Sequence, residues 1–345
     1  MLKPTGKASS AEGFAAGKLP VRLLDKLLKK YATGGRGVVV GPSIGIDSAV
    51  IDVRDGYLAA KTDPITFVAD DIGFYTVYIN ANDIAVMGGT PKWLLATILL
   101  PEGKTTEQTV EAIFSQLKGA CRELKVALCG GHTEVTAGID RPIVIGAMLG
   151  TVPEDRVITG AGARVGDDII LTKGIAIEAA SVIARNKEKE LSSVFPKGFI
   201  ERCKGLIRRP GLSVVKDARI ALKYGRVNAM HDPTEGGLST GLHELAIASK
   251  CGMLVDKASI PVLPEAQRLC GYFGLDIMGA IASGALIISI DPEDTGKVLK
   301  GLKKAGINAG RIGKVARKRE GVRIKEGGQI KPLKLFEKDE LTKIL

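Results

Sequence analysis

Four short segments each place an aspartate among glycines or other small residues, and these carboxylates are the first candidates for chemistry. They are GPSIGIDSAV around Asp47, KTDPIT around Asp63, NANDIAVMGG around Asp83 and HDPTEGG around Asp232. Magnesium binds hard oxygen ligands and commonly joins carboxylates to the phosphates of a substrate. Each segment alone has a second explanation, because Asp and Gly also mark turns and helix caps. Taken together, the four acids predict one divided site for ATP and Mg²⁺.

The segment GGHTEV is the first candidate for binding phosphate. Gly130 and Gly131 follow an expected strand, so their bare backbone could approach phosphate oxygens, and Thr133 adds a hydroxyl. His132 could serve as an acid, a base or a phosphate donor near neutral pH, and it is a catalytic candidate together with Glu134. A loop histidine held by a backbone partner is the structural alternative.

The segment HDPTEGGL is the second candidate for binding phosphate. Asp232 ends an expected strand, and Gly236 with Gly237 opens an expected helix whose N-terminus favours anions. Thr234 lies between them and is assigned to the same nucleotide site. A plain capped helix start explains these residues as well, and His231 has the same alternatives as His132.

The expected helix over residues 74–87 is almost wholly apolar, yet it contains Asn80, Asn82 and Asp83. A buried carboxylate without partners is costly or shifts its pKa, so Asp83 needs a metal, a cation or hydrogen-bond donors. Asp83 is therefore a candidate for catalysis and for binding metal, and Asn82 for binding the nucleotide. The structural alternative is a buried cap or a network aspartate.

Length and composition limit the class of protein. A chain of 345 residues with 45% hydrophobic content can bury two cores, and its length fits two domains. Its apolar runs are shorter than the roughly 18 residues that span a bilayer, and no signal-peptide core opens the chain. We therefore expect a cytoplasmic protein with no membrane partner. Five cysteines without a CxxC pair argue against a disulfide framework or a zinc ribbon.

The net charge of +11 is concentrated near the end of the chain. Residues 296–345 contain 15 Lys and Arg against 5 Asp and Glu, which supplies +10. This basic region could attract RNA, an acidic partner protein or anionic substrates, and a solvated lysine-rich surface is the structural alternative. Aromatic residues are only 4% of the chain and none interleave with the basic residues, so nucleic acid is not the expected partner.

Hydrophobic periodicity predicts an α/β chain. Residues 1–18 are small, polar and lysine-containing, and they are expected to form a mobile arm. An N-terminal nucleotide-binding domain is expected over 19–156, and a second α/β domain with the basic tail over 157–345. Further helices are expected near 20–31, 106–124, 176–184, 213–223 and 235–248, with apolar strands between them.

The order of these segments resembles the aminoimidazole ribonucleotide synthetase (PurM-like) superfamily, which includes thiamine-monophosphate kinase, selenophosphate synthetase and the hydrogenase-maturation protein HypE. The likeness runs from about Pro20 to Val315. DDIGFYTVYINANDIAVMGGTPKWL and DPTEGGL are most similar to the HypE branch. The resemblance implies an N-terminal α/β domain whose strands form a barrel across a homodimer, and a C-terminal α/β sandwich domain with ATP in the cleft.

The resemblance also implies roles for the motif residues. Asp47, Asp63, Asp83 and Asp232 would serve as magnesium and phosphate-site acids, and Gly130, Gly131 and Thr133 would line the nucleotide site. The N-terminal arm would fold over ATP. HypE-like enzymes phosphorylate the oxygen of a carboxamide on their own C-terminal cysteine and then eliminate phosphate to leave a thiocyanate.

The chain departs from the HypE pattern at three places, and these departures change the function that we expect. The chain ends in Thr342, Lys343, Ile344 and Leu345 without a cysteine. HypE has an acid and a lysine where His132 and Glu134 stand, and relatives often carry an acid where Ile46 stands. We expect a HypE-like enzyme that phosphorylates an amide or carbonyl oxygen of an acceptor that is not on its own tail. The alternatives are a small-molecule kinase of the thiamine-monophosphate type and a non-catalytic nucleotide-binding assembly factor.

Overall fold

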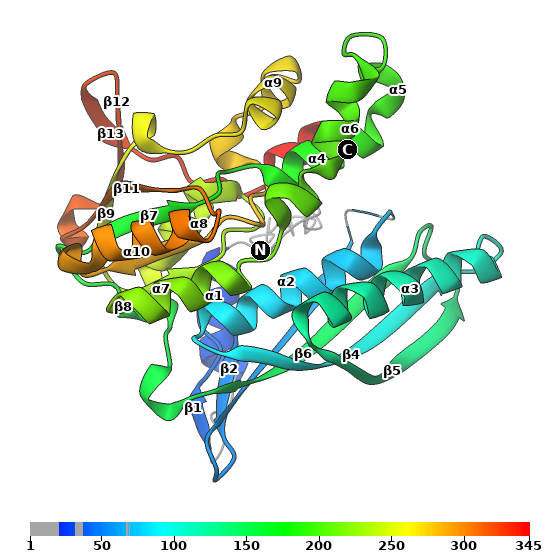
Figure 1. Ribbon diagram of the computed structural model, residues 1–345, viewed down its shortest axis with the longest axis horizontal. Coiled ribbons are helices and arrows are strands. Elements are labelled where there is room, and N and C mark those ends of the chain that lie inside the picture. The colour runs from blue at the N-terminus through cyan, green and yellow to red at the C-terminus, as the bar shows by residue number, and fades with distance from the viewer. Residues whose placement is uncertain (1–20, 32–36, 67, 69) are drawn as a thin grey trace, which may run out of the picture.

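The computed structural model describes residues 21–31, 37–66, 68 and 70–345, and it contains two β-sheets, each accompanied by helices (Figure 1). The mixed α/β class expected from periodicity is confirmed. The mobile arm predicted for residues 1–18 lies outside the described residues. Among the described residues, no helix combines the length and apolar content that crossing a bilayer requires.

The first sheet has six strands in the order β1-β2-β3-β6-β4-β5, with β4 and β5 parallel and the other neighbours antiparallel. The strands are β1 Val38–Val40, β2 Ala49–Asp52, β3 Tyr57–Ile65, β4 Thr90–Pro101, β5 Ala127–Thr136 and β6 Ile143–Val152. The middle strands alternate buried and more exposed residues, because one face packs on helices and the other does not. β5 is an edge strand whose residues are exposed on both faces except at its last position.

Two helices cover one face of this sheet, α2 (Ile72–Val86) and α3 (Glu107–Leu124). All fifteen residues of α2 are buried, which agrees with its apolar sequence, since it packs between the sheet, α3 and the second domain. In contrast, α3 is amphipathic and buries only Ile113, Leu117, Ala120 and Cys121. The central position of α2 is what brings the polar side chains of this helix to the domain junction.

The second sheet has seven strands in the order β13-β12-β9-β11-β7-β10-β8. They are β7 Asp168–Thr172, β8 Val227–His231, β9 Gly252–Asp256, β10 Ile287–Ile290, β11 Ala309–Ala316, β12 Val322–Glu326 and β13 Gln329–Pro332. All residues of β7 and β10 are buried, because helices pack on both faces of the sheet centre. Ile169 and Leu171 point to one core, whereas Ile170 points to the other.

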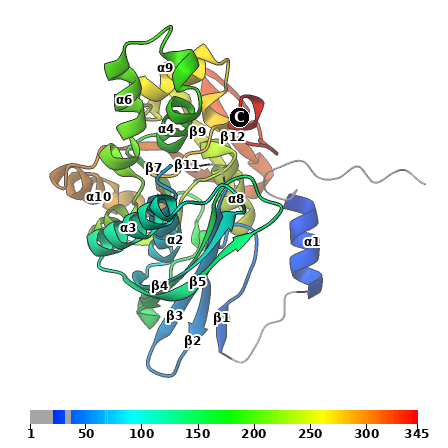
Figure 2. The ribbon, with the colours of Figure 1, turned by 90° about the vertical axis from the view of Figure 1, so that its right-hand side faces the viewer.

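Seven α-helices accompany this sheet: α4 Ile177–Asn186, α5 Glu188–Leu191, α6 Lys197–Gly205, α7 Val215–Tyr224, α8 Gly237–Ala248, α9 Pro264–Tyr272 and α10 Pro292–Lys304. α7 and α10 share one core cluster with the end of α2, and α8 belongs to the cluster on the opposite face. α4, α6 and α9 pack on each other to one side (Figures 1 and 2). α1 (Val21–Tyr31) stands beside the sheets with no buried residue (Figure 2).

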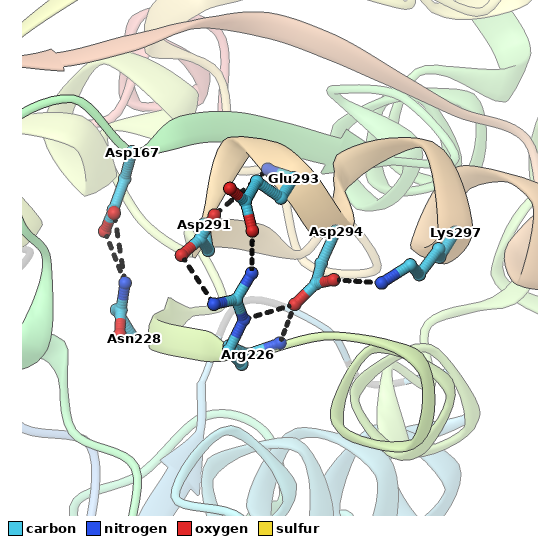
Figure 3. Close-up of polar contacts among 7 residues, drawn as sticks. All are labelled: Asp167, Arg226, Asn228, Asp291, Glu293, Asp294 and Lys297. Atoms are coloured by element: carbon cyan, nitrogen blue, oxygen red, sulfur yellow. Dashed lines mark hydrogen bonds and ion pairs between the residues drawn. The ribbon is translucent and has the colours of Figure 1, made fainter.

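A polar brace ties β8 to the start of α10 (Figure 3). The Arg226 Nε atom donates to Asp294 Oδ2 at 2.7 Å, and its Nη2 atom donates to Glu293 Oε2 at 2.9 Å. Close by, the Asn228 amide donates to both carboxylate oxygens of Asp167 at 3.0 Å. Arg226 precedes β8 and His231 ends it, so this brace holds the end of the strand opposite to His231 and Asp232.

The two domains are also linked by charged groups near the start of α2. Asp71 Oδ2 lies 2.7 Å from Arg185 Nη2, and its Oδ1 atom lies 3.2 Å from Arg208 Nη2. The Arg208 guanidinium lies over the Phe74 ring, 3.6 Å from its centroid, which adds a cation–π contact across the same junction. The domain junction is therefore held at the start of α2.

Candidate functional site

A cavity of about 560 Å³ lies at the junction of the two domains. Its acidic wall contains Asp47, Asp63, Asp83 and Asp232, so the structure brings together the four acids singled out in the sequence. Asp47 follows β1 in a loop, Asp63 lies on β3, Asp83 on α2, and Asp232 directly after β8. Four chain segments, distant in sequence, thus contribute one carboxylate each.

His231 links the two domains beside this cavity. Its Nδ1 atom lies 3.0 Å from Asp47 Oδ1, and its Nε2 atom lies 2.9 Å from Glu244 Oε2 on α8. Burial opposes protonation, but the neighbouring carboxylates of Asp47 and Glu244 outweigh it and raise the pKa of His231 well above its usual value. With both ring nitrogens engaged, the imidazolium orients Asp47 and is not available as a metal ligand.

Asp232 lacks the partners that its neighbours have. It is 2% exposed, and neither carboxylate oxygen has a hydrogen-bond partner among the described residues. Burial, followed by the charge of Asp47, raises the pKa of Asp232 to about 7. A buried carboxylate in this state is stabilised by a bound cation.

Asp83 and Asp63 share one ammonium group. Lys61 Nζ lies 3.4 Å from Asp83 Oδ2 and 3.4 Å from Asp63 Oδ2. Burial and the nearby acids raise the pKa of Asp83 well above its usual value, although Lys61 opposes this shift. For Lys61, burial would lower the pKa, but Asp83 and Asp63 outweigh it and the pKa is raised, so the ammonium stays charged.

The donor set at the Asp47 corner fits a divalent cation. Single donor atoms of Asp47, His231 and Asp232 lie within 4.8 Å of one another. Since the imidazolium of His231 is engaged, the two carboxylates supply the hard oxygens that Mg²⁺ prefers. The unpartnered oxygens of Asp232 are the observation that favours a cation at this position.

The segment after β13 closes the cavity, which the sequence did not indicate. Phe336 and Asp339 line it, and the Asp339 carboxylate accepts a hydrogen bond from the Gly236 amide at 2.8 Å. The Thr240 hydroxyl donates to the Phe336 carbonyl at 3.1 Å. The region predicted as a basic tail is therefore partly a wall of the site. An acidic partner for its lysines stays a prediction.

The glycines of HDPTEGGL are explained mainly by backbone conformation and close packing. Gly236 and Gly237 have φ values of 78° and 66°, and Gly236 caps α8 in the left-handed region. A Cβ atom on Gly237 would lie 2.6 Å from the carbonyl oxygens of Met278 and Ala280. Gly236 and Thr234 line the cavity as expected for nucleotide-site residues, whereas Gly237 is not among the lining residues.

The GGHTEV residues do not reach this cavity within one chain. Gly130, Gly131, His132, Thr133 and Glu134 lie inside the exposed edge strand β5, and none of them lines the cavity. The expectation of a phosphate loop following a strand is corrected here, because the strand continues through these residues to Thr136. The His132 Nε2 atom lies 3.1 Å from Glu134 Oε2 on the surface.

Close packing against β4 explains why a glycine stands at position 131. Its φ is 144°, and a Cβ atom there would lie 1.9 Å from the Ala96 carbonyl oxygen on β4. The β4–β5 register shifts just before this point, between Leu94 and Leu95. A glycine is thus required by the close approach of the two strands, with or without a ligand.

Asn82 joins the two domains through its side-chain amide. Its amide nitrogen donates to the Leu212 carbonyl at 2.9 Å, and its amide oxygen accepts from the Val214 amide at 2.8 Å. Both bonds are buried and cross between the domains, and Asn82 is not among the residues that line the cavity. It fastens α2 to the loop before α7, and its assignment to the nucleotide site stays a prediction.

Comparison with known proteins identifies the family. Residues 45–152 match the family described as AIR synthase related protein, N-terminal domain, and residues 164–325 match its C-terminal domain. The chain belongs to the AIR synthase-related, PurM-like superfamily, in its HypE branch. The fold class expected from the sequence is thereby confirmed, whereas a barrel across a dimer is not shown.

Several relatives of this PurM-like chain are hydrogenase maturation proteins, and a selenide, water dikinase of Methanocaldococcus jannaschii is 31% identical over 88% of this chain and 90% of that protein. A hydrogenase expression/formation protein of Methanocaldococcus jannaschii is 29% identical, over 89% of this chain and 91% of that protein. Carbamoyl dehydratase HypE of Cupriavidus necator is 30% identical, over 73% of this chain and 70% of that protein. A crystal structure of hydrogenase maturation protein HypE in complex with ATP superimposes with a TM-score of 0.71 at 24% identity, covering 94% of this chain and 96% of that one.

Proposed function

We propose that this PurM-like protein is an ATP- and Mg²⁺-dependent enzyme that phosphorylates the oxygen of a carboxamide or related carbonyl acceptor, as the name carbamoyl dehydratase of its relatives suggests. The observation that carries the proposal is the convergence of Asp47, Asp63, Asp83 and Asp232 on one cavity, with both oxygens of Asp232 buried and unpartnered. A site with this charge needs cations, and a nucleotide triphosphate with its metal supplies a matching ligand.

The chemistry removes water from a carboxamide. The acceptor oxygen attacks the γ-phosphorus, the bond from that phosphorus to the bridging oxygen breaks, and ADP leaves. The C–O bond then breaks as phosphate departs and the nitrogen loses its protons, which leaves a nitrile. The net change is carboxamide plus ATP to nitrile, ADP and phosphate. Phosphorylation is the step that converts a poor leaving oxygen into a good one.

Different residues of the cavity would bind the metal ion and the phosphates. Asp47, oriented by the His231 imidazolium, and Asp232 would hold Mg²⁺, which supplies charge neutralisation on the β- and γ-phosphates when it is bound. Asp83 and Asp63 form the adjoining wall with Lys61. Thr234 and Gly236 at the start of α8 line the cavity where a helix N-terminus favours phosphate.

A homodimer is part of the proposal. β5 is an edge strand with both faces exposed, and it carries exposed apolar residues, Leu128 and Val135. Natural proteins rarely leave such an edge unpaired, so a second copy of the chain is the proposed cover. In that assembly, β5 would carry Gly130, Gly131, His132, Thr133 and Glu134 towards the nucleotide site of the partner, which accounts for their distance from the cavity of their own chain.

The function is tested by acceptor-dependent turnover. The full chain with ATP and Mg²⁺ should release ADP and phosphate only when a carboxamide acceptor, such as an S-carbamoyl cysteine peptide, is added. Asp83→Asn should abolish this release, whereas the matched control Asp155→Asn, at an exposed position outside the cavity, should leave it unchanged. Turnover on thiamine monophosphate alone would instead establish a small-molecule kinase, and nucleotide binding without turnover on any acceptor would establish an assembly factor.

A further inference from the structure

Lys61 is a cavity residue that no sequence motif had singled out. It lies on β3, two positions before Asp63, and its side chain keeps 23% of its surface exposed in the cavity wall. Its Nζ atom is equally far, 3.4 Å, from one oxygen of Asp63 and one oxygen of Asp83. The ammonium therefore sits between two carboxylates that come from different elements, β3 and α2.

The distances indicate that Lys61 is shared and not committed to one partner. A tight charge-assisted hydrogen bond joins nitrogen and oxygen at about 2.7–2.9 Å. Both contacts here are longer, and Asp83 Oδ2 makes no hydrogen bond within the part of the chain that the structure describes. An ammonium has three donors on a flexible stem, so Lys61 keeps donors for a further acceptor that enters the cavity.

The two corners of the acidic wall consequently differ. At the first corner, Asp63 and Asp83 already have a cation, Lys61. At the second corner, Asp232 has no partner, and Asp47 is held by His231. The imidazolium of His231 is engaged by Asp47 and Glu244, so the Asp232 oxygens at the second corner have no partner among the residues that the structure describes.

We propose that Lys61 is a built-in cation of the triphosphate site, which takes the place of a second divalent ion between Asp63 and Asp83 and donates to the phosphates. The proposal rests on the ATP- and Mg²⁺-dependent function proposed above. In this proposal, Asp47 and Asp232 bind the single Mg²⁺ of the site. The contact of Lys61 with the phosphates accounts for the nucleotide affinity that remains without metal.

The test is calorimetric titration with the non-hydrolysable β,γ-methylene analogue of ATP over a series of free Mg²⁺ concentrations. Lys61→Met removes the charge and keeps much of the apolar stem. Without Mg²⁺, its affinity should fall about tenfold or more, the scale of one lost charged contact. The slope of log affinity against log free Mg²⁺ should rise by about one, since a second ion replaces the ammonium. Lys118→Met, at an exposed position on α3, should behave as wild type.

A second variant controls for misfolding of Lys61→Met, because that substitution leaves Asp83 buried without a cation. Lys61→Met combined with Asp83→Asn removes this buried charge together with its cation, and it should unfold near the temperature of the wild type. Its metal-free affinity for the analogue should still be about tenfold lower. Wild-type affinity of this double variant without Mg²⁺, or an unchanged Mg²⁺ slope in Lys61→Met, would overturn the role of Lys61.

The same titrations separate this inference from the function on which it rests. If the wild-type chain does not bind the analogue at any Mg²⁺ concentration, the ATP-dependent function itself fails. If the wild type binds the analogue and the Lys61 variants match it at every Mg²⁺ concentration, only the role of Lys61 fails.

Discussion

Asp232 and Glu178 are both buried carboxylates, but they differ in whether a ligand in the cavity can reach them. Asp232 faces the cavity, and both of its oxygens lack protein partners. Glu178, at the start of α4, also has an oxygen without a hydrogen-bond partner among the described residues, and the Ser283 and Tyr75 hydroxyls lie near it. Asp232 can be satisfied by a ligand from the cavity, whereas Glu178 is 6% exposed and does not line the cavity.

Asp232→Asn should separate binding from folding. The amide keeps the volume but removes the charge that would hold Mg²⁺, so metal-dependent binding of an ATP analogue should fall about 100-fold or more. The ligand-free melting temperature should stay the same or rise, because no protein hydrogen bond is lost. Calorimetry and thermal melting measure the two quantities. A lower melting temperature with unchanged binding would contradict the assignment.

Glu178→Gln should change the pH dependence of stability. Burial, with the acids Asp339 and Glu235 nearby, raises the pKa of Glu178 from 4.5 to about 7. Ionisation therefore favours the unfolded chain, and wild-type stability falls as pH rises from about 4.5 to 7 and stays low above that. Gln has no charge to desolvate, so the variant should be more stable by roughly 1–3 kcal/mol at pH 8.

The measurement for Glu178→Gln is urea unfolding without ligand at pH 5 and at pH 8. Most of the difference from wild type should vanish at pH 5, where the folded carboxyl is already protonated. An equal difference at both values would mean that lost packing or hydrogen bonding, and not charge, governs this position.

At the scale of elements, α2 is the part that holds the site together. It lies between the first sheet, α3 and α7, and its buried polar residues each join a different neighbour. Asn80 accepts from the Asp63 amide on β3 at 2.9 Å, and Asn82 holds the Leu212–Val214 loop. Asp83, one position later, therefore reaches the cavity from a helix that is fixed to both domains.

Asn82→Ala should destabilise the fold through the domain junction. It leaves the Leu212 carbonyl and the Val214 amide buried without partners, which costs about 2–4 kcal/mol for two such groups. Urea unfolding of the ligand-free chain measures the loss. Asn186→Ala is the matched control, because its amide bonds only to Val182 within its own helix. A loss for Asn82→Ala that is no larger than for this control would contradict the junction role.

At the scale of the whole molecule, the edge strand β5 is exposed along almost its whole length. Val135 is 57% exposed on this strand, and Trp93 on the neighbouring β4 is 40% exposed. The glycine-rich segment that the sequence assigns to the nucleotide lies on the same edge. A second chain that covers β5 would account for the exposed apolar residues and for the position of this segment.

Val135→Asp should break the proposed dimer. A charge on an edge strand opposes pairing with another strand, so light scattering should find two chains for the wild type and one for the variant. Val165→Asp is the control, because Val165 is 59% exposed in the loop before β7. A wild type of single-chain mass, or a Val135→Asp variant that stays paired, would count against the dimer.

Local pattern was enough to predict most elements of this chain. The apolar periodicity predicted helices over 74–87, 106–124 and 235–248, and the structure has α2, α3 and α8 at these places. Gly-rich and polar breaks marked their ends, since these features depend on neighbours a few residues apart. The strand containing Gly130 was predicted too short, because its pairing with β4 continues through residues that locally suggest a loop.

The sequence by itself determined which carboxylates are unusual, because an aspartate in an apolar helix or at a strand end needs a partner wherever it lies. Only the tertiary structure decided which partner each one has: Lys61 for Asp63 and Asp83, His231 for Asp47, and none for Asp232. It also placed Asn82 at the domain junction and the segment after β13 against the cavity. Asn82 and Leu212 are 130 positions apart, and Asp47 and His231 are 184 positions apart, and nothing in the local spacing of the chain encodes such contacts.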